Sequence, residues 1–128
     1  MTTENLTMEK FETTIENNDI VLIDFWAEWC GPCKMFGPIF EKASEKHRDV
    51  AFTKCNTEEE QDLAGHFGIR SIPTLAIFRE KILLLMQPGA LSEGALEDII
   101  SRVKALDMDE IRDKIAEESG KTAKEKMN

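Results

Sequence analysis

The sequence predicts one α/β domain in which a central mixed β-sheet is flanked by helices on both faces. Its 128 residues suit a single compact domain and are too few for two ordinary ones. Apolar runs of strand length also alternate with segments of helical periodicity. The resulting order is helix, strand, helix, strand, helix, strand, strand, helix, which is typical of a mixed sheet covered on both sides.

The chain begins with a predicted helix and a predicted buried strand. Thr7 is placed to cap the helix, and Phe11 and Ile15, four residues apart, form its inner face. The run IVLIDFW, residues 20–26, is apolar on both sides. Such a run is expected at a central, mainly parallel position in a sheet.

A long helical pattern follows and leads to a second strand. The pattern runs from Pro32, which is favoured in a first helical turn, to about Arg48. Pro38 lies inside it and should kink the helix. The run VAFTKCN, residues 50–56, predicts the second strand.

The next elements are a short helix and two strands. Residues 57–67 have acids in the first turn and carry Leu63 and Phe67 on the inner face. The strands TLAIF and KILLLMQ are joined through Arg79-Glu80-Lys81. None of these turn residues favours positive φ, so a longer or less regular turn is expected.

A last helix and a charged segment complete the chain. Ser92 can cap a helix with one apolar stripe, formed by Leu96, Ile99, Val103 and Leu106. The segment 107–128 is rich in charge, and a short helix to about Ser119 followed by a disordered tail is expected there.

Composition excludes several classes of partner. The net charge is −9, which would repel phosphate backbones and anionic membranes, so neither nucleic acid nor membrane is an expected partner. The N-terminal MTTENLTMEK does not resemble a secretory signal, and no apolar run is long enough to span a membrane. We therefore expect a cytoplasmic protein, in which a close cysteine pair is more often catalytic or metal-binding than structural.

The segment WCGPCK contains such a pair, Cys30 and Cys33. A zinc site would need a second pair of ligands, and Cys55, His47 and His66 do not form one by spacing. A structural disulfide would close a very small loop and would not persist in a reducing compartment. No metal and no other cofactor is therefore expected.

A redox role explains more of this segment. Cys30 directly precedes the helix that Pro32 opens, where free N–H groups and the helix dipole favour thiolate over thiol. Cys33 lies one turn inside the helix on the same face, within reach of a bond formed at Cys30. Cys30 is therefore the predicted nucleophile and Cys33 the resolving thiol.

The surrounding residues carry a family resemblance. The segment IDFWAEWCGPCK resembles the active-site segment of the thioredoxin family, and FGIRSIPT and GALSEGALEDII lie where that family has its later landmarks. The resemblance covers residues 6–106. It implies a thioredoxin fold for residues 1–106, followed by a charged C-terminal extension over residues 107–128.

Two charged residues are candidates for proton transfer. Asp24 interrupts the apolar strand, so burial should raise its pKa. The resemblance matches it to a buried aspartate that assists deprotonation of the second cysteine, here Cys33. It also places Lys54 near Asp24, where a positive charge would tune the acid. The remaining thiol, Cys55, is expected to be an inert core residue.

A substrate-binding surface is expected around Cys30. The resemblance implies a cis peptide bond before Pro73, where the sequence alone favours trans. In that geometry the backbone of Ile72 could pair with an extended substrate segment. An apolar patch on a small domain indicates a binding surface. The expected patch consists of Trp29, Gly31, Pro32, Ile72, Pro73, Gly89 and Ala90.

The resulting expectation is a monomeric thiol–disulfide oxidoreductase that reduces disulfides in partner proteins. The resemblance implies that a thioredoxin reductase, an NADPH-dependent flavoprotein, recycles it. Three alternatives remain open at this point. They are an oxidase or isomerase of the same fold, a binding module whose cysteines only gate docking, and an acidic extension that recruits a partner.

Overall fold

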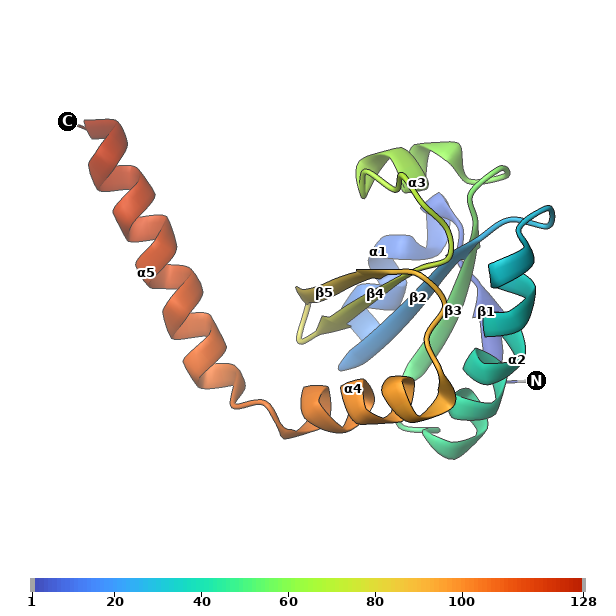
Figure 1. Cartoon of the computed structure of the whole chain (residues 1–128). Coiled ribbons are helices and arrows are strands. Elements are labelled where there is room, and N and C mark those ends of the chain that lie inside the picture. The colour runs from blue at the N-terminus through green and yellow to red at the C-terminus, as the bar shows by residue number, and fades with distance from the viewer. Residues whose placement is uncertain (1, 128) are drawn as a thin grey trace. The chain divides into compact units, whose positions relative to one another are not determined.

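The computed structural model describes residues 2–127, with side chains described for residues 2–120. Its centre is a five-stranded mixed sheet in the order β1-β3-β2-β4-β5 (Figure 1). The expected α/β class with a mixed sheet is therefore confirmed.

The central strand β2, Ile20–Trp26, carries the core. It pairs parallel with β3, Ala51–Asn56, and antiparallel with β4, Thr74–Arg79. All residues of β2 before Trp26 are buried, as its uninterrupted apolar run predicts. The carboxyl ends of β2 and β3 lie at the same edge of the sheet because these two strands are parallel.

The two faces of β2 receive different helices. Val21, Ile23 and Phe25 belong to a core cluster that also contains Ile15 of α1, Met8–Asn17, and Leu63 of α3, Gln61–His66. On the opposite face, Phe40 of α2, Gly31–Lys46, packs 5.1 Å from Phe52 of β3 between ring centroids. The first helix has the predicted cap, because Thr7 accepts a hydrogen bond from the N–H of Lys10.

One strand was not predicted. The strand β1, Thr3–Asn5, pairs parallel with β3 at the edge of the sheet. Its sequence, TEN, has no apolar residue and only three positions, so it gives no strand pattern. The threonine Thr3 also donates a hydrogen bond to Glu41 of α2.

The expectation for the β4–β5 turn was wrong. Arg79 pairs directly with Ile82 of β5, Ile82–Pro88, so the loop has two residues and is tight. Both of them have positive φ, 50° for Glu80 and 70° for Lys81. Pairing of the flanking strands imposes this conformation, which two-residue hairpins commonly adopt.

The chain divides into two compact units between Glu97 and Asp98, inside α4, Glu93–Ala105. Ser92 caps α4 as predicted, accepting a hydrogen bond from the N–H of Ala95. Leu96 and Val103 of the predicted stripe are buried, and Ile100 is buried where Ile99 was expected.

The last helix, α5, is longer than predicted. It extends over Met108–Met127 instead of ending near Ser119. Residues 121–127, KTAKEKM, are mostly Lys, Glu, Ala and Met, which are strong helix formers and explain the continuation. No helix within residues 2–127 combines the length and the apolar character needed to cross a membrane.

Candidate active site

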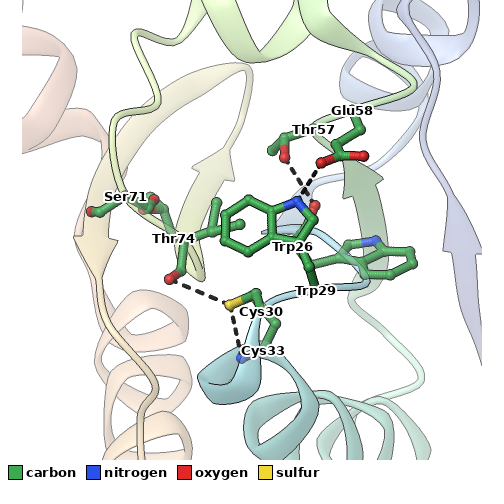
Figure 2. The surroundings of a disulfide bond; sticks show 9 residues. Trp26, Trp29, Cys30, Cys33, Thr57, Glu58, Ser71 and Thr74 are labelled. Atoms are coloured by element: carbon green, nitrogen blue, oxygen red, sulfur yellow. Dashed lines mark hydrogen bonds between the residues drawn. A yellow bond between two sulfur atoms is a disulfide. The ribbon is translucent and has the colours of Figure 1, made fainter.

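The two cysteines of WCGPCK form a disulfide at the start of α2 (Figure 2). Their Cα atoms are 5.2 Å apart. Cys30 is the N-cap residue of the helix, and its sulfur accepts a hydrogen bond from the N–H of Cys33 at 3.2 Å. The sequence predicts the same position for Cys30, immediately before the helix, because Pro32 is favoured in a first helical turn.

This position favours a thiolate at Cys30 once the bond is reduced. The N–H of Cys33 is one of the donors that a helix leaves unpaired at its beginning. The helix dipole adds a partial positive charge at the same end. Both effects stabilise a negative sulfur relative to a neutral one, as in other helix N-terminal cysteines.

The loop before β4 lies directly against the disulfide. The peptide bond between Ile72 and Pro73 is cis, as expected. The carbonyl oxygen of Ile72 is 3.6 Å from the sulfur of Cys30. Pro73 itself is buried, so it shapes the loop and offers little surface.

A second loop supports the first. The N–H of Gly89 donates to the carbonyl oxygen of Pro73 at 2.8 Å. Gly89 has φ 97°, a conformation that side chains rarely tolerate. Gly89 and Ala90 are exposed, as are Gly31 and Pro32 beside the cysteines.

Trp29 is the most prominent apolar side chain beside Cys30. It is 68% exposed, and its indole N–H donates to the carboxylate of Glu58 (Figure 2). Glu58 follows β3 and was not among the predicted site residues. Because it is one of several acids in the run TEEEQD, spacing alone does not distinguish it.

Asp24 is fully buried in β2, with 0% of its surface exposed. Within the described part of the chain, neither of its carboxylate oxygens has a hydrogen-bond partner. Desolvation raises the pKa of Asp24 to about 7, against the lowering effect of the Lys54 charge. The carboxyl can therefore exchange a proton near neutral pH, which is the property expected of a general acid or base.

Lys54 is the register partner of Asp24 across the β2–β3 pair. Its ammonium nitrogen lies 5.1 Å from the centroid of the Trp26 ring, a cation–π contact. A Cβ atom on Gly37 would lie 3.9 Å from the same nitrogen. The ammonium is thus held between β2 and α2, close to the acid that it tunes.

A pocket of about 440 Å³ opens beside these groups. Its lining includes Cys33, Lys54 and Trp26, together with Gly37 and Pro38 of α2. The pocket is roomy enough for ordered water next to Cys33.

The third cysteine lies outside this site. Cys55 is 0% exposed in β3, opposite Phe25. Burial, followed by the charges of Glu60 and Asp24, raises the pKa of its thiol to about 12. The thiol is therefore neutral and shielded, in agreement with its prediction as a core residue. Among the described side chains, no three His, Cys, Asp or Glu residues converge as possible metal ligands.

The fold and the disulfide together define a thiol–disulfide oxidoreductase. The thioredoxin family model matches residues 2–102. A Streptomyces coelicolor protein described as "Putative thioredoxin 2" is 55% identical over 116 residues, which cover 91% of this chain and 87% of the relative. A thioredoxin from Alicyclobacillus acidocaldarius is 41% identical and covers 77% of this chain and 98% of its own.

A solved structure agrees with these matches. A mutant thioredoxin from Halobacterium salinarum superimposes with a TM-score of 0.77 at 34% identity, covering 82% of this chain and 93% of that one. This chain belongs to the thioredoxin family. Its activity is that of a protein-disulfide reductase.

Proposed function

We propose that the chain is a CGPC-type thioredoxin that acts through a mixed disulfide at Cys30. The observation that carries this proposal is the environment of the Cys30 sulfur, which meets the N–H of Cys33 on one side and the Ile72 carbonyl on the other. The first contact favours a thiolate. The second puts the backbone of Ile72 beside it, where an extended substrate can align.

In the first step the Cys30 thiolate attacks one sulfur of a partner's disulfide. A bond forms between Cys30 and that sulfur, and the other partner sulfur leaves as a thiolate that takes up a proton. In the second step the Cys33 sulfur attacks Cys30 and releases the second partner thiolate. The partner gains two electrons, and the chain ends as the Cys30–Cys33 disulfide.

Asp24 and Lys54 are assigned to the second step. Asp24 accepts the proton of Cys33, and the pocket beside Cys33 gives room for water to relay it. The pKa of Asp24 near 7 suits this exchange. Lys54 lowers that pKa by its positive charge. The binding surface around Cys30 is assigned to Trp29, Gly31, Pro32, Ile72, Gly89 and Ala90, and the buried Pro73 is assigned to shaping its loop.

The remaining parts of the proposal concern the cellular setting. The partners are proteins with accessible disulfides, and a thioredoxin reductase drawing on NADPH restores the dithiol. The chain works in the cytoplasm as a monomer and needs no bound cofactor. Its net charge of −9 supports a role away from nucleic acid and anionic membrane.

Cysteine substitutions test the proposed roles. With insulin as the disulfide substrate, Cys30→Ser should abolish reduction, because the nucleophile is lost. Cys33→Ser should accumulate a mixed disulfide at Cys30, detected by mass spectrometry. Cys55→Ala, which removes the buried third thiol, is the matched control and should retain activity. If Cys30→Ser still supported the activity of a partner protein that depends on this chain, the cysteines would not be needed for reduction and a binding module would be favoured instead.

A further inference from the structure

A groove of about 370 Å³ lies beside the loop that carries the cis peptide bond. Its lining includes the apolar residues Ala64, Gly65 and Ile69, at the end of α3 and just beyond it. Its lining also contains Trp29, Gln61 and Arg70. The groove therefore combines an apolar base with polar groups that can discriminate between ligands.

The groove is continuous with the reacting sulfur. Ile72 also lines it, and the carbonyl oxygen of Ile72 lies 3.6 Å from the Cys30 sulfur. A substrate whose cysteine is bonded to Cys30 must therefore pass close to the Ile72 backbone. The residues that flank this cysteine then lie at the groove.

Arg70 brings an unneutralised positive charge to this groove. It is exposed, and within the described residues it forms no ion pair. By contrast, Arg102 lies 3.0 Å from a carboxylate oxygen of Asp98. Because the chain has a net charge of −9, a guanidinium without an ion pair gives the groove a positive charge on a protein that is negative as a whole. Its fork of donors suits a carboxylate.

The shared groove relates Arg70 to a particular substrate position. Arg70 precedes Ile72 by two residues in a loop that bends at Ser71 and Ile72, and both residues line the groove. A substrate strand aligned with Ile72 has its cysteine opposite Cys30. In an extended substrate, the side chain two residues from that cysteine lies about 7 Å further along, at the groove that Arg70 lines.

We propose that Arg70 makes this reductase selective for disulfides flanked by an acidic residue two positions from the attacked cysteine. The carboxylate pairs with the guanidinium at the groove, and the stem of the substrate side chain packs on the apolar lining residues. This inference rests on the proposed function, because it assumes attack by Cys30. It adds a substrate class, acidic peptide segments, to that reaction.

The test compares peptide disulfides that differ only in one charge. Peptides carry Asp or Lys two residues before or two residues after the cysteine, and kcat/KM for their reduction is measured at low salt. Arg70→Glu reverses the groove charge. Arg48→Glu is the matched control, because Arg48 is also exposed but lies before β3, at the opposite end of that strand from the site.

The wild-type chain is expected to prefer Asp over Lys by about threefold to fivefold in one of the two positions. Arg70→Glu should reverse the preference, Arg48→Glu should leave it, and about 1 M salt should abolish it. An unchanged preference in Arg70→Glu, or the same change in both variants, would overturn the proposal. Reaction of the reduced chain with neutral dithiodipyridine is measured in parallel, and its absence would refute the proposed function instead.

Discussion

The sulfur of Cys30 is both the cap of α2 and the proposed attacking atom. Its hydrogen bond from the N–H of Cys33 ties the helix start to the chemistry. The same N–H of Cys33 that the sulfur caps in the disulfide state would stabilise a thiolate after reduction. A single local feature, a helix beginning at the motif, therefore accounts for the proposed reactivity.

Asp24 should make stability depend on pH. Its pKa is about 7 in the folded chain and near 3.8 when unfolded, so the folded state binds the extra proton between these values. The free energy of unfolding should therefore fall as pH rises from about 4 to 7 and then level off. Asp24→Asn removes this penalty and should stabilise the chain by roughly 2–4 kcal/mol at pH above 7.

Denaturant unfolding of the oxidised chain measures this effect. The gain from Asp24→Asn should be large at high pH and small below about pH 4, where the carboxyl is protonated in both states. Asp62→Asn, at an exposed position on α3, is the control and should show no such dependence. A gain of equal size at both pH values would contradict the assignment.

Lys54 should act on the reaction through Asp24. Lys54→Met keeps the aliphatic stem but removes the charge that lowers the Asp24 pKa. The pH profile of resolution by Cys33 should therefore shift to higher pH. Single-turnover release of substrate from the mixed disulfide, followed from pH 6 to about 9, measures it. A profile that stays in place would remove Lys54 from the mechanism.

Residue-level prediction succeeded where a residue type conflicts with its surroundings. Asp24 inside the apolar run IVLIDFW is one such residue, and the structure shows the buried acid that it predicted. Pro32, two residues after Cys30, is another, and the structure shows the helix start that it predicted. The Trp29–Glu58 hydrogen bond was missed. It joins two turns that become neighbours only when β2 and β3 pair, so no local sequence pattern predicts it.

At the scale of elements, the β4–β5 hairpin has a strained backbone at its turn. Glu80 and Lys81 both occupy positive φ, where a Cβ atom costs about 1 kcal/mol per residue. Glu80→Asn with Lys81→Gly should therefore raise the free energy of unfolding by roughly 1–2 kcal/mol. Denaturant unfolding measures the gain, and activity should not change because the turn is remote from Cys30.

Alanine at both turn positions separates backbone strain from charge. Glu80→Ala with Lys81→Ala removes the same charges but keeps both Cβ atoms, so it should not stabilise. If the alanine variant gained as much as the Asn-Gly variant, strain at positive φ would not be the cause.

Elements with strong periodicity were predicted well, and those defined by their neighbours were not. The strands β2 and β4 follow from their apolar runs. The strand β1 exists because β3 offers an edge to pair with, and its own residues are polar. The tight turn likewise follows from the pairing of β4 with β5, which overrides the residue preference at positions 80 and 81.

At the scale of the whole molecule, residues 1–106 remain the proposed thioredoxin domain and residues 107–128 an extension. The family match ends at residue 102, before α5 begins at Met108. A chain ending at Leu106 should keep kcat/KM for insulin within about twofold. Because Met108 is buried, the truncation should lower the free energy of unfolding by about 1–2 kcal/mol. A truncated chain without activity would assign the extension to the reductase itself.

The reduction potential of the Cys30–Cys33 pair tests the central claim, that this chain donates electrons to disulfides. It is measured by equilibration in defined thiol buffers with tryptophan fluorescence as the readout. We expect a value near the thioredoxin family's, about −270 mV, which makes the dithiol a reductant. A value of about −120 to −180 mV would place the chain with the oxidants and isomerases and would contradict the account.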